Sequence, residues 1–470
     1  MKVLLALPPN IHSLEIYKIT GMNAPPLGLA YIASVLEKAG HKVKIIDSPT
    51  LKMSTEEFLH EIRSWKPDLV GLSLITPTAL SGYRVIKKIK EEFHELPIIV
   101  GGPHPTFMFK EALNEGADIV VRFEGEYTTL ELVNTIEKYG LNHNALRKIK
   151  GIAFKDSNGE YVVTENRPLI ANLDELPWPA RHLLPMDKYT VFNKPIRIAH
   201  VMASRGCPYG CVYCSTSYFW GRAVRFRSAE NVVNEIEHLV EKYGVKSIVF
   251  ADDELTINRV FIENFIREIR ERGLDITFAC GSRVDHVDRE LIRKLYGNGC
   301  VMLYFGVESA SQETINKIGK RITLDQAVKA FKWVKEVKGA ASGSFILGFP
   351  WETIEDMKKT VEFAIKLDPD YAQFTALTPY PGTPLYRFAK RFRLIVDENW
   401  EHYTTIKPVM RGFHFTLNDL SKMLKYAYRR FYLRFKFIWR ELKAGRLRDI
   451  ASILMKEVSQ VLAEVFKEAI

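Results

Sequence analysis

The sequence predicts an α/β protein with two successive parallel-sheet domains and a helical C-terminal region. Three observations lead to this class. The chain has 470 residues, which is too many for one ordinary hydrophobic core. Short continuous apolar segments alternate with helical periodicity through most of its length, as is typical of parallel sheets covered by helices. Near residue 385 this alternation ends, and basic, aromatic helical sequence follows.

Residues 1–145 are expected to form a first domain around a parallel sheet of flavodoxin or Rossmann type. Strands are predicted at 3–7, 43–47, 69–74, 98–100 and 119–121, and helices at 27–39, 55–65, 81–93, 109–115 and 130–138. Such sheets bind ligands in the loops after their strands. The candidate binding residues in these loops are Asn10, Ser73, Thr76, Gly101, Gly102, Pro103, His104, Glu124 and Gly125. Each loop taken alone is better explained as a tight turn.

Residues 146–197 are expected to connect this domain to the next. Asp156-Ser-Asn-Gly159 lies between two short apolar segments and predicts a β-hairpin. Five prolines follow, at positions 168, 177, 179, 185 and 195. Because proline interrupts both helices and central strands, this part is predicted to run as an extended strap.

Residues 198–384 repeat a strand and a helix, giving six strands and five intervening helices. The strands are predicted at 198–204, 247–251, 276–280, 301–308, 343–347 and 371–377, and the helices at 229–243, 260–272, 289–298, 324–337 and 354–367. Periodicity alone fits both a flat doubly wound sheet and an incomplete barrel. In barrels the functional residues lie at the carboxyl ends of the strands, and here these ends carry Asp253, Glu254, Arg283, Glu308 and the run Gly348, Phe349 and Pro350.

Three of the five cysteines, Cys207, Cys211 and Cys214, occur within eight residues. Three thiolates on one loop can bind three irons of a 4Fe-4S cluster and leave the fourth iron open. A zinc site is the alternative, but zinc would need a fourth protein ligand, and none stands at the usual spacing. The other two cysteines, Cys280 and Cys300, lie in or beside apolar strands and are interpreted as core thiols.

This cysteine segment resembles the signature of the radical S-adenosylmethionine (SAM) enzymes, in which an aromatic residue, here Tyr213, precedes the last cysteine. The resemblance implies that the open iron binds SAM and that an electron from the cluster cleaves SAM to a 5′-deoxyadenosyl radical. It also implies an incomplete barrel, a (β/α)6 fold, for the second domain. Tyr213 is then expected to lie beside the adenine of SAM.

The same resemblance gives roles to the residues at the strand ends. Asp253 or Glu254 is expected to bind the amino group of SAM and Arg283 its carboxylate, with Glu308 on the ribose hydroxyls. The backbone at Gly348, Phe349 and Pro350 is expected near the adenine or the methionine part. For a single acidic residue at a strand end, capping of the following helix is an equally good explanation.

The first-domain loops, together with residues 23–31, resemble the cobalamin-binding domain that precedes one large branch of radical SAM enzymes. The chain has no Asp-x-His-x-x-Gly string, which in other cobalamin proteins supplies a histidine ligand to cobalt; His12 and His104 are nearest by position. We therefore expect cobalamin bound without a lower histidine ligand. The methylthiotransferases are disfavoured because they carry three further cysteines, and none precedes Cys207 here.

Residues 385–470 are expected to be helical, with one long helix at 418–443 that begins at Asn418 as its cap, and a second helix at 450–466. Aromatic and basic residues are interleaved on the first of these helices. Three interpretations compete: a packed helical cap on the barrel, an amphipathic surface that takes a lipid with an anionic head group, and a nucleic-acid face. The last is the least favoured.

Taken together, the sequence predicts a cobalamin-dependent radical SAM enzyme that uses a 4Fe-4S cluster, SAM and cobalamin. The predicted reaction is methylation of an unactivated carbon through the 5′-deoxyadenosyl radical and methylcobalamin. The alternatives are a cyclase or carbon–carbon bond-forming enzyme acting on a lipid or tetrapyrrole, and, in another class, an RNA-associated modification protein.

The expected partners are a small-molecule or lipid substrate and an electron donor such as ferredoxin or flavodoxin. No apolar segment reaches transmembrane length, and the start of the chain is too short for a signal peptide, so a cytoplasmic location is predicted. An oxygen-poor, reducing compartment suits an exposed cluster. The net charge of +10 suggests an anionic partner, and the basic C-terminal helix is a candidate for contact with a membrane surface.

Overall fold

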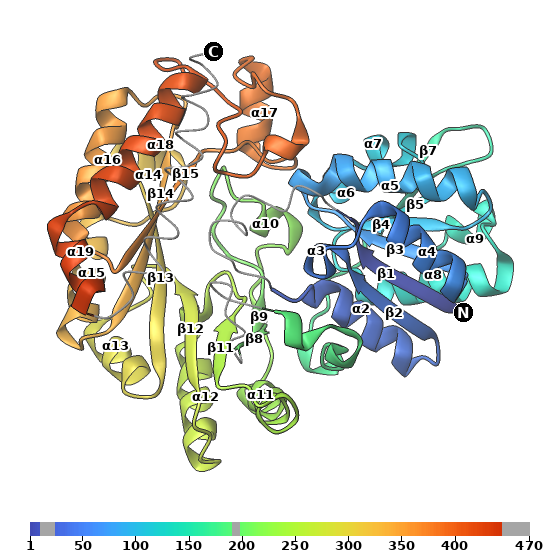
Figure 1. The fold of residues 1–470 in the computed structure, drawn as a ribbon, viewed down its shortest axis with the longest axis horizontal. Helices are drawn as coiled ribbons and strands as arrows, with labels where there is room; N and C mark the ends of the chain where they lie inside the picture. Colours follow the sequence, from blue (N-terminus) through green and yellow to red (C-terminus); the bar gives the residue numbers. More distant parts are fainter. Residues whose placement is uncertain (10–23, 190–197, 444–470) are drawn as a thin grey trace.

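The computed structural model describes residues 1–9, 24–189 and 198–443, which form two sheet domains side by side with the C-terminal helices on the outer side of the second (Figure 1). Asn10, His12 and the predicted helix at 450–466 lie outside the described residues.

The first sheet has seven strands in the order β2-β1-β3-β4-β5-β6-β7. Its parallel part comprises β1 (Lys2–Leu7), β2 (Lys42–Asp47), β3 (Leu69–Ser73), β4 (Ile98–Gly101) and β5 (Ile119–Val121). The strands β6 (Ile152–Lys155) and β7 (Tyr161–Val163) form the predicted hairpin, but β6 pairs antiparallel with β5. The hairpin therefore extends the first sheet, where the sequence had predicted a connector between domains.

Helices cover both faces of this sheet, and each face has its own apolar core. The helices are α2 (Leu27–Lys38), α3 (Ser48–Leu51), α4 (Thr55–Trp65), α5 (Ala79–Glu92), α6 (Pro103–Phe107), α7 (Phe109–Asn114), α8 (Glu126–Tyr139) and α9 (His143–Leu146). The strands β1, β3, β4 and β5 are almost entirely buried, which is why they appear in the sequence as continuous apolar segments.

The second sheet is fully parallel, with its strands in the order β15-β14-β13-β12-β11-β8. These strands are β8 (Ile198–Val201), β11 (Ser247–Phe250), β12 (Thr277–Ser282), β13 (Cys300–Glu308), β14 (Ala340–Leu347) and β15 (Tyr371–Ala376). The covering helices are α11 (Ala229–Tyr243), α12 (Arg259–Glu271), α13 (Arg289–Tyr296), α14 (Gln312–Lys317), α15 (Leu324–Glu336) and α16 (Ile354–Leu367). Six sequentially ordered parallel strands with outer helices form the predicted partial (β/α)6 barrel (Figure 1).

Several helices begin where the sequence supplies a capping box, in which the cap side chain and the third helical residue bond each other's backbone N–H groups. Thr353 and Asp356 start α16 in this way, and Thr416 and Asp419 start α18 (Leu417–Tyr432). The C-terminal helix is therefore capped by Thr416 rather than by the predicted Asn418. It also ends earlier than predicted. Leu433 and Arg434 are not helical, and they separate α18 from a second helix, α19 (Phe435–Lys443).

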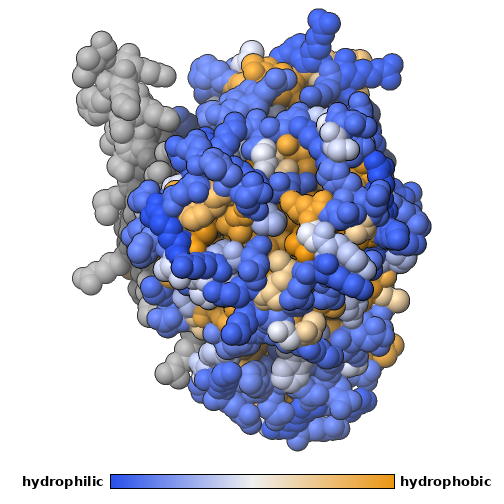
Figure 2. All heavy atoms as spheres, turned by 90° about the vertical axis from the view of Figure 1, so that its right-hand side faces the viewer, coloured by the Kyte–Doolittle hydropathy of each residue, from blue (hydrophilic) through white to orange (hydrophobic). Residues whose placement is uncertain are grey.

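The helices beyond the barrel pack closely on it. Helix α17 (Pro384–Arg391) precedes α18, which lies against α16 and the edge strand β15. Among the described helices, none combines the length and the apolar character needed to cross a bilayer. Figure 2 shows the end of the molecule formed by the first domain, where apolar residues are exposed in patches separated by hydrophilic ones.

Candidate active site

The three clustered cysteines lie on the loop between β9 (Ser204–Arg205) and α10 (Thr216–Phe219). Neighbouring loops hold this loop through its backbone: Val212 N–H donates to the carbonyl of Ile318 at 3.0 Å, and Leu385 N–H donates to the carbonyl of Val212 at 2.9 Å. Gly206 has a φ of 96°, and a Cβ there would stand 2.4 Å from the carbonyl oxygen of Ala223. Only glycine fits this turn into the cysteine loop.

The chemistry of the donors fits an iron–sulfur cluster. All three thiols are free, and burial raises their pKa values, to about 11 for Cys207. They are therefore protonated at neutral pH until a metal displaces the protons. Within the described residues, no three Cys, His, Asp or Glu side chains converge on a point that would suit a single metal ion. Three thiols on one loop suit a cluster, in which each thiolate binds a different iron.

Two acidic residues follow β11 and differ in their surroundings. Asp253 is exposed and accepts a hydrogen bond from Thr216 Oγ1 at 2.9 Å, beside the cysteine loop. Glu254 is buried; its Oε1 accepts from Thr256 Oγ1 at 2.6 Å, whereas its Oε2 has no hydrogen-bond partner among the described residues. A buried carboxylate oxygen without a donor is costly, so Glu254 Oε2 marks a place where a ligand donor fits.

Arg283, the predicted partner of the SAM carboxylate, is already engaged. Its Nε and Nη2 atoms each lie 2.9 Å from a carboxylate oxygen of Asp285, and Nη2 also donates to the carbonyl of Lys320 at 2.7 Å. The guanidinium stacks on the ring of Tyr209, a residue of the cysteine loop, at 3.5 Å from the ring centroid. Arg283 thus orders the cysteine loop in this structure, and in these contacts it keeps only part of its donor capacity for a ligand.

Glu308, at the end of β13, is buried and has a φ of 71°. Its Oε1 accepts from Lys320 Nζ at 2.5 Å. Burial, together with the negative charge of Glu308, raises the pKa of the Tyr213 hydroxyl well above its usual value. Tyr213 and Glu308 are therefore neighbours, and the ring of Tyr213 also meets the edge of Phe349 with 6.3 Å between centroids. The structure brings these three predicted residues together.

The segment Gly348–Pro350, after β14, is held by the carboxylate of Glu352, which was not among the predicted site residues. Glu352 Oε2 accepts from the backbone N–H groups of Gly348 and Phe349 at 3.3 and 3.1 Å, and Oε1 accepts from Ser309 Oγ at 3.1 Å. Gly348 has a φ of 93°, and a Cβ there would lie 2.7 Å from Leu420 Cδ2. Glu352 thus joins the loops after β13 and β14. The predicted backbone contacts of Gly348 and Phe349 would have to use their carbonyl groups.

On the first domain, the loops after β3 and β4 lie together at the carboxyl edge of the sheet. Ser73 ends β3, and Gly101 ends β4. Gly102 has a φ of 102° and approaches the carbonyl oxygen of Leu74, from which a Cβ would be only 2.6 Å away. His104 is buried with its two ring nitrogens 3.3 Å from Thr76 Oγ1 and Glu111 Oε1. Both ring nitrogens of His104 therefore have partners within the first domain.

Glu124 and Gly125 follow β5, and here the structure shows a contact between domains. Glu124 is buried and accepts from Arg205 and Arg225 of the second domain and from the backbone N–H of Ile170. A Cβ on Gly125 would lie 2.9 Å from Ile32 Cδ1. The carboxylate of Glu124, predicted to contact cobalamin, is thus fully occupied by the domain interface.

A cavity of about 280 Å³ lies where the two domains meet. Its lining combines first-domain loops, the residue after Cys214, and loops beyond β15: Ile75, Thr76, Pro77, Pro103, Ser215, Tyr380, Pro381, Thr404 and Thr405. Thr405 has a φ of 67°, a strained conformation for a β-branched residue, and its carbonyl accepts from Ala376 N–H at 2.7 Å. Such strain is often found at functional sites. The predicted cobalamin loops and the cysteine loop therefore border one cavity.

Comparison with known proteins agrees with this geometry. Residues 201–364 match the model of the radical SAM superfamily, and residues 20–133 match that of the B12 binding domain. An uncharacterized methyltransferase of Pyrococcus horikoshii is 41% identical over 444 residues, which cover 94% of this chain and 95% of the relative. This chain is a radical SAM enzyme with a B12-binding domain.

Two further comparisons bear on this family assignment. The anaerobic magnesium-protoporphyrin IX monomethyl ester cyclase of Cereibacter sphaeroides is 32% identical over 92% of this chain and 71% of its own. The structure of the cobalamin-dependent SAM radical enzyme OxsB, with aqua-cobalamin and SAM bound, gives a TM-score of 0.76 at 18% identity, over 98% of this chain and 70% of that one. At this identity the likeness to OxsB shows the fold alone. The predicted family, fold and cofactor class are confirmed at the level of the family.

Sequence reasoning missed several residues of this radical SAM site. The Tyr209 hydroxyl lies 2.5 Å from His286 Nε2, and His286 Nδ1 lies 3.1 Å from Glu254 Oε1, so a chain of polar groups joins the cysteine loop to β11. Lys320 and Glu352 were missed because they stand several residues after the strands they serve. The available signal for Glu352 was an acidic residue two positions after a proline, in Gly-Phe-Pro-Trp-Glu.

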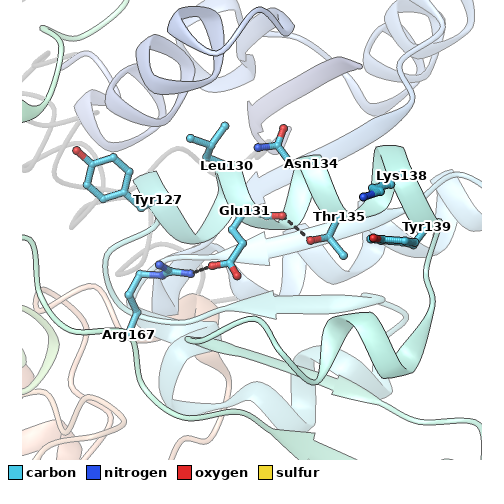
Figure 3. Close-up of a pocket in the computed structure, with 8 residues that line it drawn as sticks. All are labelled: Tyr127, Leu130, Glu131, Asn134, Thr135, Lys138, Tyr139 and Arg167. Atoms are coloured by element: carbon cyan, nitrogen blue, oxygen red, sulfur yellow. Dashed lines mark hydrogen bonds and ion pairs between the residues drawn. The ribbon is translucent and has the colours of Figure 1, made fainter.

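A second hollow, of about 380 Å³, lies on the outer side of α8 (Figure 3). Arg167 and Glu131 form an ion pair at its edge, and Thr135 Oγ1 donates to the carbonyl of Glu131 at 2.8 Å. None of the predicted site residues lines this hollow. The cavity between the domains is therefore the candidate active site.

Proposed function

We propose that this chain is a cobalamin-dependent radical SAM methyltransferase that methylates an unactivated carbon. The observation that carries the proposal is the shared cavity, because Thr76 and Pro103 of the first domain and Ser215 beside Cys214 border the same space. Chemistry that combines two cofactors needs both to reach one substrate within a few ångströms. The name of the 41% identical relative supports methyl transfer over other outcomes.

The residues present fit the cofactors in the following way. Cys207, Cys211 and Cys214 would hold the 4Fe-4S cluster, and Asp253 and Glu254 at the end of β11 would take the amino group of SAM. Tyr213, Glu308 and the Gly348–Pro350 run would surround its adenosine, with Arg283 next to its carboxylate. The loops at Ser73, Thr76 and Gly101–His104 would hold cobalamin. When bound, cluster and SAM supply the hydrogen-abstracting radical, and cobalamin supplies the methyl group.

The lining of the cavity also suggests the substrate class. Among the described residues, it contains no Asp, Glu, Lys or Arg. Aliphatic and proline side chains alternate with the hydroxyl groups of three threonines, Ser215 and Tyr380. Such a wall suits an apolar group with a few hydrogen-bonding atoms, since a charged group would be left without a partner. We propose that the carbon to be methylated belongs to an uncharged portion of a lipid or another small molecule.

The test is anaerobic reconstitution with iron, sulfide and cobalamin, followed by incubation with methyl-deuterated SAM and separate lipid and soluble extracts. Mass spectrometry is expected to find a product carrying the label, together with S-adenosylhomocysteine and 5′-deoxyadenosine. Cys211→Ala is the control, since without this ligand SAM cleavage to 5′-deoxyadenosine should be lost. Retained cleavage in Cys211→Ala would contradict the mechanism.

A second candidate is oxidative ring closure or another carbon–carbon bond formation without methyl transfer. The 32% identical cyclase supports it, because that relative matches this chain over nearly the same length. The same experiment separates the two reactions. A cyclase would give an unlabelled product two hydrogens lighter than its substrate, with 5′-deoxyadenosine and no S-adenosylhomocysteine.

The reaction also needs an electron donor, and we propose an acidic carrier such as ferredoxin or flavodoxin. The net charge of +10 supports an acidic partner, since opposite charges speed the encounter of two proteins. The expected result is a rate of cluster reduction that falls steeply as salt is raised. Reduction that is insensitive to salt would argue against this partner.

We further propose that the protein works in the cytoplasm and touches membrane surfaces through α19. Four apolar side chains spaced as one helical stripe are exposed there, namely Phe435, at 79%, Ile438, Trp439 and Leu442, with Lys436 and Lys443 beside them. Aromatic residues next to lysines are typical of helices at a lipid interface. In vesicle flotation, Trp439→Glu should reduce binding to anionic lipid. Val260→Glu, at an equally exposed apolar position on α12, should not.

A further inference from the structure

Four charged side chains are buried between the two domains. Arg205 Nη1 donates to Glu124 Oε1 at 3.0 Å, and its Nη2 donates to Glu126 Oε1 at 2.5 Å. Arg225 Nη1 lies 2.8 and 3.0 Å from the two oxygens of Glu124. The side chains of these residues are no more than 9% exposed. Two carboxylates and two guanidinium groups thus neutralise each other away from water.

These four charged residues lie next to both halves of the site. Glu124 and Glu126 flank Gly125 between β5 and the start of α8, in the loop predicted to contact cobalamin. Arg205 ends β9 and is separated from Cys207 only by Gly206. Because only this one residue separates them, a shift of Arg205 is expected to displace the first cluster cysteine as well.

Aromatic contacts fix the direction of the Arg205 side chain. Its guanidinium lies 5.3 Å from the ring centroid of Tyr31 on α2 and 5.0 Å from that of Trp220. A second contact crosses the interface nearby, where Phe123 packs on Phe219 of α10 with 6.2 Å between centroids. A planar guanidinium held by two carboxylates and two rings has one orientation, which the flexible ammonium of a lysine would not reproduce.

We propose that Arg205 is a positioning residue that sets the separation of the first domain, at the loop after β5, and the cysteine loop, so that the radical and the methyl group reach the same substrate carbon. This inference rests on the proposed function. Buried ion pairs are poor stabilisers compared with apolar contacts of the same size, but they specify one register of two surfaces. In a reaction that uses two cofactors, the relative position of the two domains decides whether a radical formed near the cysteine loop reaches the substrate carbon that takes the methyl group.

The test compares Arg205→Lys with Arg181→Lys in the full, reconstituted chain. Arg181 is an equally buried arginine between the domains: its Nη2 lies 2.7 Å from both Glu235 Oε1 and the carbonyl of His200, but none of its contacts involves either loop. The readout is the ratio of methylated product to 5′-deoxyadenosine. Arg205→Lys should lower this ratio about tenfold, because ångström-scale misplacement costs up to about a hundredfold in rate. Arg181→Lys should leave it unchanged.

A second readout does not depend on activity. In the protein without cofactors, hydrogen–deuterium exchange should rise at residues 122–126 and 203–208 in Arg205→Lys, and not in Arg181→Lys. If Arg205→Lys does not fold, Glu126→Gln replaces it, since this variant removes one ion pair and keeps the shape. An unchanged product ratio, or equal losses in both variants, would overturn the proposal. If the wild-type protein gives no methylated product, the proposed function fails, and the exchange experiment still tests the coupling of the two loops.

Discussion

At the scale of single residues, the site depends on a few backbone positions that only glycine can occupy. Gly206 is the clearest, because both its positive φ and the carbonyl of Ala223 exclude a side chain. Gly206→Ala is expected to distort the cysteine loop and to lower the iron content after reconstitution from a full cluster to a small fraction. Iron and sulfide analysis measures this. Gly140→Ala is the control, since Gly140 also has a positive φ but no atom near its Cβ position. Gly140→Ala should keep its cluster and lose stability only through backbone strain, on the order of 1–3 kcal/mol.

Glu352 carries a second prediction at this scale. Burial raises the pKa of its carboxyl from 4.5 to about 7, against the effect of three donated hydrogen bonds. A raised pKa means that the folded state binds the proton more tightly, so this stabilisation is full below about pH 4.5 and is lost as the pH rises through 7. The loss is on the order of 3 kcal/mol, at about 1.4 kcal/mol for each tenfold change in proton affinity.

Glu352→Gln keeps the shape of the side chain and cannot ionise. Denaturant unfolding at pH 5.5 and pH 8 should show that the variant gains stability relative to wild type as the pH is raised. Glu57 is the control, because its carboxyl is exposed and hydrogen bonds from Ser54 lower its pKa. Glu57→Gln should show no such gain. Equal stability differences at the two pH values would show that Glu352 is already ionised in the folded protein at pH 5.5.

At the scale of elements, α18 explains how the open edge of the barrel is closed. Strand β15 is the last strand of its sheet, and an unpaired edge exposes N–H and C=O groups. Tyr432 OH accepts from Ala372 N–H and donates to the carbonyl of the same residue, and Tyr428 OH does the same for Phe374. One helical turn rises about as far as two strand residues, so two tyrosines four apart match two residues two apart.

Removing either hydroxyl should therefore leave two backbone groups of β15 without a partner. Tyr428→Phe and Tyr432→Phe are each expected to destabilise the protein by about 1–3 kcal/mol and to increase its aggregation on heating. Thermal unfolding with light scattering measures both effects. Tyr426→Phe, on the exposed side of the same helix, should behave as wild type. If all three variants behave alike, the tyrosines serve only as packing groups.

The elements also show what sequence reasoning could reach. The strands of the first sheet were predictable because most of them are buried on both faces, whereas strands of the second sheet alternate between buried and more exposed residues. Most predicted bounds agree within two residues. The hairpin β6–β7 was predicted, but its pairing with β5 depends on a non-local contact that no local pattern encodes. The break between α18 and α19 was missed because Leu433 and Arg434 continue the helical composition.

At the scale of the whole molecule, the contacts between domains are what the sequence could not predict. The sequence predicted that Glu124 contacts cobalamin, and it could not show that Glu124 pairs with Arg205, which is 81 residues away. In the same way the sequence did not show that Arg283 pairs with Asp285, two residues later, and the role of Arg283 beside the SAM carboxylate stays a prediction. Charged residues at strand ends look alike in sequence whether they bind a ligand or another domain. Only the tertiary structure separates these cases.

The last prediction concerns the buried ion pairs between the two domains. Glu124→Ala would leave Arg205 and Arg225 buried without one of their carboxylates, which typically costs about 3–5 kcal/mol. Because the loss falls on the contact between domains and not on either core, calorimetry is expected to resolve two unfolding transitions where the wild-type protein shows one. Glu131→Ala is the matched control: it removes the half-exposed pair with Arg167 in Figure 3, and surface pairs contribute about 0–1 kcal/mol. Two transitions in the wild-type protein, or a single lowered transition in Glu124→Ala, would mean that these ion pairs do not couple the two domains.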